Sequence, residues 1–248
     1  MQVSILIPAF NPDEQLLQLI DNLISSGFDS IVVVNDGSSD RCTPIFDKIQ
    51  SKAHCHLLRH VVNGGKGRAL KTGLAYLLSH VPDACGVVTC DADGQHLVGD
   101  VTKVARILEY EPESLVLGVR SFGAKVPLRS RLGNVITRSL FYLLVGTQIS
   151  DTQTGLRGIP RSFMPFLIDL EGEGYEFEMN MLIVSKIRSI PLVEEKICTV
   201  YIESNKSSHF NPLLDSMKIY YMLLRFSLPY SFTRFKNVWN KTDKGLFD

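Results

Sequence analysis

The stretch "VSILIPAFNPDEQLLQLIDNLISSGFDSIVVVND", Val3 to Asp36, decides the fold. Its two ends, "VSILIP" and "SIVVVND", are short apolar runs rich in β-branched residues, and each stops at Pro, Asn or Asp, which is typical of buried strands. Between them apolar residues recur at helical spacing, at Leu16, Leu17, Ile20, Leu23 and Ile24. Asn11 can cap this helix, with Pro12 at the first helical position and Glu14 completing a capping box. The chain therefore opens with a strand, a helix and a second strand.

The same alternation continues through the first half of the chain. "CHLLRH" (55–60), "CGVVTC" (85–90) and "SLVLGV" (114–119) are predicted strands, and 66–79 is a predicted helix. Apolar strands that alternate with helices indicate an α/β fold with a Rossmann-like, mostly parallel central sheet and helices on both faces. Ligands of such sheets bind beyond the carboxyl ends of the strands, where "NDGSSD" (35–40) and "DADGQH" (91–96) fall.

The second half is less regular. Apolar spacing predicts amphipathic helices over 132–143 and 213–224 and a helix that starts near Phe177, and "VEEKICTVYIE" (193–203) is a predicted strand. The segment 225–244 carries five basic residues, one acid and interspersed aromatic residues. This tail and the 132–143 stripe suit contact with a membrane surface, although amphipathic helices more often pack into the core or a dimer interface.

Composition limits the class of protein. The 248 residues are 45% hydrophobic and 21% charged, which fits one large globular domain with an elaborated end. Basic and acidic residues both number 26, so the net charge argues neither for nor against nucleic acid, and we expect no nucleic acid partner. Five cysteines without a CxxC pair suggest reduced thiols in the cytoplasm. We expect no signal peptide, because the N-terminus lacks a basic region before an apolar core. We expect no membrane span either, since no run of about 18 apolar residues occurs.

Charge is distributed unevenly along the chain. The segment 114–150 has no acid and five bases, Arg120, Lys125, Arg129, Arg131 and Arg138. An acid cluster follows at Asp169, Glu171, Glu173, Glu176 and Glu178. An acid-free basic segment suggests an anionic ligand such as phosphate, and the alternative is a solvated basic face.

Two carboxylates, Asp91 and Asp93, end the hydrophobic strand in "VVTCDADGQH" (87–96). A divalent cation relieves the repulsion of such a pair, and Mg²⁺ or Mn²⁺ prefers oxygen ligands of this kind together with substrate phosphates. Gln95, two residues after Asp93 as Asp93 is two residues after Asp91, offers a third oxygen. The alternative is an Asp-rich turn that caps the next helix.

Two other ligand patterns fail on spacing. The histidines of "HCHLLRH" (54–60) lack the paired spacing of zinc ligands, and strand alternation explains them better. "NGGKGRALKTG" (63–73) lacks the Ser or Thr that follows the lysine of a P-loop. A turn that carries Lys66 into a helix N-terminus still suits an anion.

Five motifs, taken together, resemble family 2 glycosyltransferases with the GT-A fold. "PAFNPDE", "VVNDGSSD", "GGKGRAL", "CDADGQH" and "SDTQTGLRG" occur in the family's order, and the chain is most similar to polyprenyl-phosphate and dolichol-phosphate sugar synthases. The resemblance covers about residues 2–225. It implies a GT-A domain over 1–225, with a nucleotide-binding half at about 1–115 and an acceptor half at about 116–225. A basic, aromatic tail (226–248) follows.

The resemblance also implies roles for the matching positions. The DxD motif at the end of its strand would hold Mg²⁺ or Mn²⁺ against the diphosphate through Asp91, Asp93 and Gln95. The nucleotide sugar would contact Pro8, Ala9, Asn11, Glu14, Asp36, Gly37, Lys66, Asp91, Ala92, Asp93 and Arg120. Catalysis would involve Asp93, Arg131 and Glu176. The acceptor side would include Asp151, Gly155, Arg157, Lys206 and Ser207.

The implied activity is a metal-dependent, inverting transfer of a sugar from a nucleoside diphosphate sugar to a polyprenyl phosphate. A lipid phosphate is already ionised, whereas a glycan hydroxyl, the second acceptor class, needs a general base such as Glu176 or Glu178. A sugar-1-phosphate nucleotidyltransferase and a non-catalytic nucleotide-sugar binder are further alternatives. We expect a cytoplasmic protein peripheral to the inner membrane face, with a homodimer as an open possibility.

Overall fold

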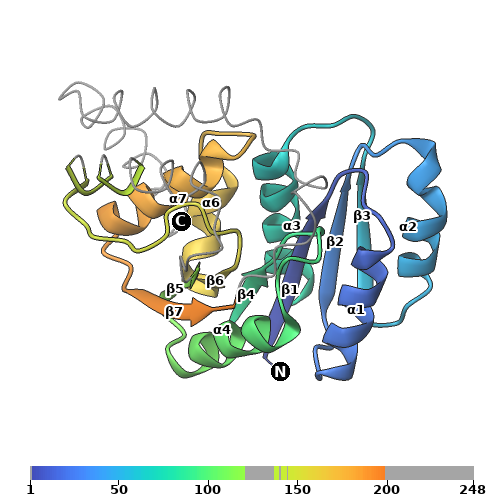
Figure 1. The fold of residues 1–248 in the computed structure, drawn as a ribbon, viewed down its shortest axis with the longest axis horizontal. Coiled ribbons are helices and arrows are strands. Elements are labelled where there is room, and N and C mark those ends of the chain that lie inside the picture. Colours follow the sequence, from blue (N-terminus) through green and yellow to red (C-terminus); the bar gives the residue numbers. More distant parts are fainter. Residues whose placement is uncertain (1, 121–136, 140, 144, 199–248) are drawn as a thin grey trace, which may run out of the picture.

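A computed structural model describes residues 2–120, 137–139, 141–143 and 145–198 (Figure 1). Its strands are β1 (Val3–Ala9), β2 (Ile31–Asp36), β3 (Cys55–His60), β4 (Gly86–Thr89), β5 (Leu115–Arg120), β6 (Arg157–Pro160) and β7 (Leu192–Ile197). Its helices are α1 (Gln15–Ser25), α2 (Thr43–Gln50), α3 (Lys66–His80), α4 (Val98–Tyr110), α6 (Met164–Ile168) and α7 (Glu176–Ile187). The described residues of 137–145 are helical as well.

The strands form one seven-stranded sheet in the order β3-β2-β1-β4-β6-β5-β7. β1 pairs in parallel with β2 and β4, β2 with β3, and β5 with β7. β6 is antiparallel to both of its neighbours, β4 and β5. The predicted α/β class with a mostly parallel sheet is therefore confirmed.

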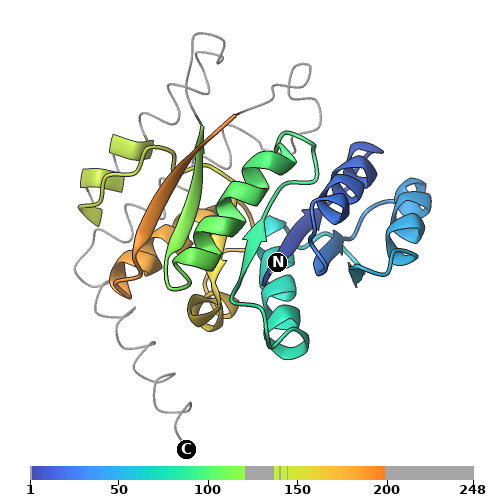
Figure 2. The same ribbon diagram turned by 90° about the horizontal axis from the view of Figure 1, so that it is seen from below.

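Helices cover both faces of this sheet because the strands are apolar on both sides. Leu6, Val32 and Val34 pack with α3, α6 and α7, whereas Ile5 and Ile7 pack with α1, α2 and α4. Seen from below, α1 and α4 lie on one side of the sheet and α3 on the other (Figure 2). Each fully buried aliphatic side chain contributes roughly 1.5–3 kcal/mol, so these two layers provide the main driving force for folding.

The predicted strands at 55–60, 85–90 and 114–119 and the predicted helix at 66–79 are all present, within one or two residues. The predicted start of α1 is wrong. Asn11 has a positive φ of 47°, and its side-chain oxygen accepts hydrogen bonds from the backbone N and the Oγ of Ser39, both at 2.9 Å. The helix begins only at Gln15, with no side-chain cap on its N-cap residue Glu14. The predicted helix 213–224 and the tail lie outside the described residues, as do parts of the predicted helix 132–143 and strand 193–203.

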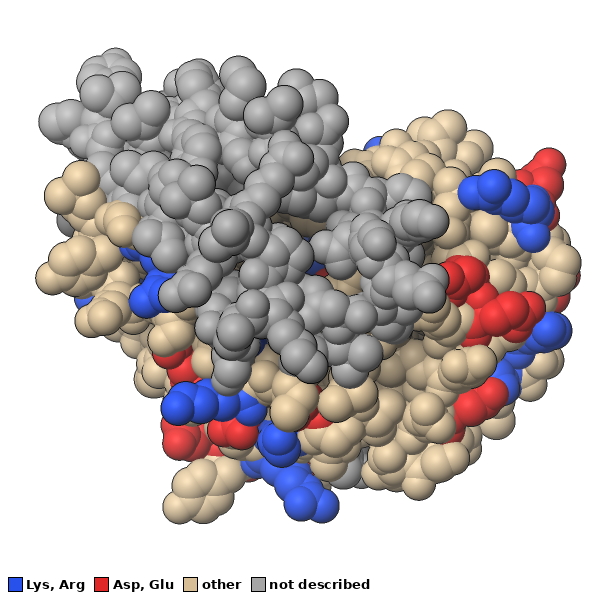
Figure 3. Space-filling view, viewed as in Figure 1, with Lys and Arg blue, Asp and Glu red and all other residues tan. Residues whose placement is uncertain are grey.

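No helix in the described part of the chain combines the length and hydrophobicity that a membrane span requires. Side chains of both signs lie next to one another on the described surface of the face in Figure 3. Several exposed ones are paired, as in Lys48–Glu14 at 3.6 Å and Arg59–Asp47 at 3.6 Å. Pairs of this kind contribute little to stability, about 0–1 kcal/mol each.

Candidate active site

The parallel register brings four loops to one edge of the sheet. Ala9 of β1 lies opposite Asn35 of β2, and Asp36 of β2 lies opposite His60 of β3. β4 runs parallel to β1 and ends at Thr89, directly before the "CDADGQH" segment. The carboxyl ends of these strands therefore bring together the loops in which the sequence predicted a nucleotide site.

Lys66, the first residue of α3, lies at the centre of this edge. Its Nζ is 2.7 Å from Oδ1 of Asp91 and 3.0 Å from Oε1 of Glu178, and it lies 5.5 Å from the centre of the Tyr175 ring. The Lys66 and Glu178 side chains are only 13% and 7% exposed. Burial alone would lower the pKa of Lys66, but Asp91 and Glu178 more than reverse this and raise it. Lys66 is therefore held as a cation between two carboxylates from different parts of the chain.

Asp91 is fixed on both of its oxygens. Oδ1 contacts Lys66, and Oδ2 lies 3.3 Å from Nε2 of His96. A Cβ atom on Gly155 would overlap Oδ2, so the glycine of the "DTQTG" motif leaves room for this carboxylate. Burial would raise the pKa of Asp91, but Lys66 and His96 hold it well below its usual range. Asp91 is therefore ionised and occupied by direct contacts within the chain.

Asp93 lies in a different electrostatic environment. Its Oδ1 accepts a hydrogen bond from the backbone N of Gln95 at 3.1 Å. Burial and the neighbouring Asp91 raise the pKa of Asp93, so its negative charge is unfavourable here. A cation would relieve that cost. In the described part of the chain, no group of three or more His, Cys, Asp or Glu side chains could hold a metal ion. A carboxylate such as Asp93 can bind Mg²⁺ together with phosphate oxygens. The metal role predicted for Asp91, Asp93 and Gln95 stays a prediction.

Asp36 and Gly37 hold the neighbouring loop. Oδ1 of Asp36 accepts from the backbone N of Gly64 at 2.9 Å, and Oδ2 accepts from that of Gly65 at 2.8 Å. Gly37 has φ +67°, and a Cβ on it would overlap the backbone of the 62–63 segment. Both residues lie where the sequence predicted them, and each one packs against the 62–65 loop.

The other predicted nucleotide contacts divide into two groups. Pro8 and Ala9 end β1, and Ala92 lies between the two aspartates, so all three lie at the edge described above. Glu14, whose side chain is 67% exposed, pairs instead with Lys48 of α2 at 3.6 Å.

Two predicted arginines are paired inside the protein. Nε and Nη2 of Arg120 donate to the two carboxylate oxygens of the fully buried Asp151, at 2.6 and 3.0 Å. Arg157 is fully buried, and its guanidinium donates to the carbonyl oxygens of Thr152, Thr154 and Glu178. These contacts tie the "SDTQTGLRG" segment to β5 and α7, and the roles predicted for both arginines at phosphate or acceptor stay predictions.

Glu176 contacts its own helix terminus. Its Oε1 accepts from the backbone N of Glu173 at 3.1 Å and of Gly174 at 3.0 Å, and a negative charge is favourable at a helix N-terminus. Its predicted catalytic role stays a prediction. Arg131, Lys206 and Ser207 lie outside the described residues.

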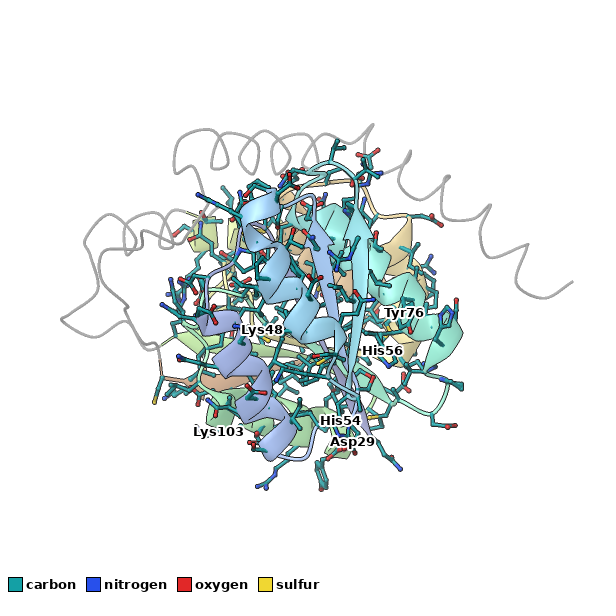
Figure 4. All side chains as sticks on the ribbon, turned by 90° about the vertical axis from the view of Figure 1, so that its right-hand side faces the viewer. Asp29, Lys48, His54, His56, Tyr76 and Lys103 are labelled. Atoms are coloured by element: carbon teal, nitrogen blue, oxygen red, sulfur yellow. The ribbon has the colours of Figure 1, made fainter. Side chains whose placement is uncertain are left out.

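Sequence reasoning gave no role to two histidines of this edge. His96 belongs to the "CDADGQH" motif and contacts Asp91, whereas Nδ1 of His60 lies 2.7 Å from Oδ1 of Asp36. His60 could have been identified from the sequence, because it ends the predicted strand 55–60 and would lie beside Asp36 at the end of the neighbouring strand. His56 of β3 contacts the hydroxyl of Tyr76 at 3.1 Å instead, and His54, which precedes β3, lies near Asp29 (Figure 4).

Comparison of the sequence with known proteins identifies its family. The family model described as Glycosyl transferase family 2 matches residues 4–164. An uncharacterized protein of Methanocaldococcus jannaschii is 32% identical over 228 residues, which cover 90% of this chain and 91% of that protein. The UDP-N-acetylglucosamine–dolichyl-phosphate N-acetylglucosaminyltransferase of Methanococcus voltae is 30% identical over 242 residues, with 90% and 94% covered.

Solved structures support the fold. The glucosyl-3-phosphoglycerate synthase of Mycobacterium tuberculosis, crystallised with Mn²⁺, UDP and phosphoglyceric acid, superimposes with a TM-score of 0.66 at 21% identity. The match covers 91% of this chain and 78% of that one. The chain therefore belongs to glycosyl transferase family 2, has a GT-A fold, and is a glycosyltransferase similar to the enzymes that transfer sugars to polyprenyl phosphates.

Proposed function

We propose that this enzyme transfers a sugar from a nucleoside diphosphate sugar to a polyprenyl phosphate, with Mg²⁺ or Mn²⁺ bound at Asp93. The observation that carries the choice of acceptor is the state of the acidic side chains around Lys66. Glu178 is buried in an ion pair with Lys66, and Glu176 accepts hydrogen bonds at the start of α7. The one carboxylate oxygen of the pair left for proton transfer is Oε2 of Glu176, which is buried and has no hydrogen-bond partner among the described residues.

A phosphate acceptor removes the need for such a base. Its attacking oxygen is already ionised near neutral pH, so a bond forms between that oxygen and the anomeric carbon while the bond to the donor diphosphate breaks. No proton has to leave. A glycan hydroxyl, the alternative acceptor, must lose a proton, which would require Glu178 to leave Lys66 or the buried Oε2 of Glu176 to become accessible.

The other steps, binding the diphosphate and holding the metal, fall to residues at the edge of the sheet. Lys66, at the N-terminus of α3, offers a positive charge and helix N–H groups to the diphosphate. Asp93, with Gln95 beside it, would hold the metal. When bound, the metal stabilises the negative charge that develops on the departing diphosphate. Asp91 orients Lys66 through their 2.7 Å contact.

Two independent findings support the proposal. The Methanococcus voltae relative, matched over nearly its whole length, is named for a nucleotide sugar donor and a dolichyl-phosphate acceptor. The raised pKa of Asp93 marks a site that gains from a bound cation. We also propose that the chain works at the cytoplasmic membrane surface, since a polyprenyl phosphate is confined to a bilayer.

The donor is tested first. UDP-, GDP-, dTDP- and CMP-sugars are added with Mn²⁺ and the melting temperature is followed, because a ligand that binds only the native state raises it by mass action. The donor that gives a shift is then incubated with polyprenyl phosphate in detergent. We expect a polyprenyl-phosphate sugar and release of the nucleoside diphosphate, and both should be lost in Asp93→Asn.

The acceptor class is tested with Glu178→Gln. If the acceptor is a phosphate, this variant should keep at least about a tenth of the wild-type rate, because no base is removed. Loss of a general base would instead cost about 10²- to 10⁴-fold. A loss of that size, together with transfer to saccharide hydroxyls by the wild-type enzyme, would refute the choice of a phosphate acceptor.

A further inference from the structure

A chain of polar contacts links the ends of β2 and β3 to α3. Nδ1 of His60 lies 2.7 Å from Oδ1 of Asp36, and Nε2 of His60 lies 3.0 Å from Oγ1 of Thr72. Because a carboxylate can only accept, Nδ1 carries the proton and donates to Asp36, and Nε2 shares the second hydrogen bond with the Thr72 hydroxyl. The side chains of His60 and Asp36 are 12% and 4% exposed, so water competes little for these bonds.

The same carboxylate holds the loop that leads into α3. Asp36 accepts the backbone N–H groups of Gly64 and Gly65, the two residues before Lys66. Gly65 has φ +97°, and a Cβ on it would overlap the carbonyl oxygen of Glu173. The loop is thus confined on one side by Asp36 and on the other by the 172–174 segment. Its conformation determines the position of the Lys66 backbone at the start of α3.

We propose that His60 and Thr72 are positioning residues for Lys66. His60 orients the Asp36 carboxylate toward the two glycine N–H groups, and Thr72 holds the imidazole from the second turn of α3. Lys66 is then presented with its Nζ between Asp91 and Glu178. His60 and Thr72 need not touch the substrate, and they act through the loop.

This inference deepens the proposed function, since Lys66 belongs to its site, but its test needs no substrate. Failure of the inference and failure of the proposed function can therefore be told apart. The readout is the rate at which sulfo-N-hydroxysuccinimide acetate acetylates Lys66 at pH 8, followed by peptide mass spectrometry. Lys66 reacts slowly in the wild-type protein while it is ion-paired and buried.

Lys71 is a matched internal control. It lies in the same helix, its side chain is also 13% exposed, and it is ion-paired with Glu173 at 2.6 Å, but it has no contact with Asp36 or His60. Lys103, which is 51% exposed and ion-paired with Asp100 at 2.8 Å, gives the rate of a paired but more accessible lysine in the same sample.

In His60→Leu we expect acetylation of Lys66 to accelerate about tenfold, the factor that the loss of one hydrogen bond to a charged group can give. The acetylation rates of Lys71 and Lys103 should change less than about twofold in the same variant. An unchanged rate at Lys66 would overturn the proposal. So would an equal acceleration at Lys71, because it would mean that α3 had merely loosened.

Two conservative variants sharpen the test. His60→Asn keeps a donor near the position of Nδ1 and should restore a slow rate at Lys66. Thr72→Val removes only the hydroxyl and should accelerate Lys66, whereas Thr72→Ser should not. The Thr72 pair decides the question if His60→Leu does not fold, and equal rates at Lys66 in Thr72→Val and Thr72→Ser would then refute the proposal.

Discussion

Replacing Lys66 by Met tests the central ion pair most directly. The substitution keeps most of the side-chain volume but removes the ammonium that lies 2.7 Å from Asp91 and 3.0 Å from Glu178. Glu178 is 7% exposed and would be left as an uncompensated buried charge. Breaking a buried pair in this way costs about 3–5 kcal/mol. Asp91 is 30% exposed and keeps its contact with His96, so it adds less.

We therefore expect Lys66→Met to lower the free energy of unfolding by about 3 kcal/mol, the low end of that range. For a chain of this size that corresponds to a fall in melting temperature of roughly 6–12 °C. Urea unfolding at pH 7, followed by far-ultraviolet circular dichroism, measures the change from the transition midpoint and slope. Lys71→Met is the control: its partner Glu173 is 57% exposed, so the loss should stay near 1 kcal/mol or below.

A double-mutant cycle identifies the cause. In a Glu178→Gln background the buried charge is already gone, so Lys66→Met should cost only about 1 kcal/mol, an interaction energy of about 2 kcal/mol. Equal costs of Lys66→Met in both backgrounds would refute the reasoning, since the loss would then come from packing rather than from the pair.

Three further predictions follow from the described contacts. Because burial and Asp91 raise the pKa of Asp93, its ionised form destabilises the folded state as pH rises through that pKa. Asp93→Asn should therefore melt a few degrees higher in chelator at pH 7 yet lose any stabilisation by Mn²⁺ with nucleoside diphosphate, and a lower melting temperature in chelator would contradict this. Arg157→Met removes the guanidinium that donates to three buried carbonyl oxygens and should cost about 3 kcal/mol or more in urea unfolding. Unchanged stability with lost transfer would instead make Arg157 an acceptor contact. Burial raises the pKa of Cys55 to about 11, so at pH 8 only about one thousandth of it is the reactive thiolate. Iodoacetamide should modify the exposed Cys198 first and Cys55 roughly a hundredfold more slowly, with the Cys55 rate rising about tenfold per pH unit. Similar rates at the two thiols would exclude a raised pKa at Cys55.

The fold was predictable where local pattern determines structure. Strands buried on both faces must be apolar throughout, so β1, β2 and β4 are evident from short runs of aliphatic residues. β6 was missed because its four residues, "RGIP", contain a glycine and a proline and carry no strand pattern. It becomes a strand by inserting antiparallel between β4 and β5.

The site shows the same division between local and distant partners. Asp91, Asp93 and Lys66 stand in short motifs at strand and helix ends, so their shared edge follows from the parallel topology. Pairings between distant segments could not be predicted: Asn11 bonds Ser39 rather than its own helix, and Arg120 bonds Asp151, 31 residues away. A residue with donors or acceptors to spare takes the partner that the tertiary fold supplies.

The acid cluster at 169–178 gains a physical explanation from these contacts. Two of its five members meet the basic N-terminal turns of α3: Glu178 pairs with Lys66, and Glu173 pairs with Lys71 and accepts the backbone N of Arg68 through its carbonyl. A Cβ on Gly67 would overlap the same segment, so the two parts lie in close contact. Because Lys66 also holds Asp91, a single ammonium joins a carboxylate that follows β4 to one that begins α7. The two paired acids, Glu173 and Glu178, thus help to dock the 172–178 segment on the N-terminal turns of α3.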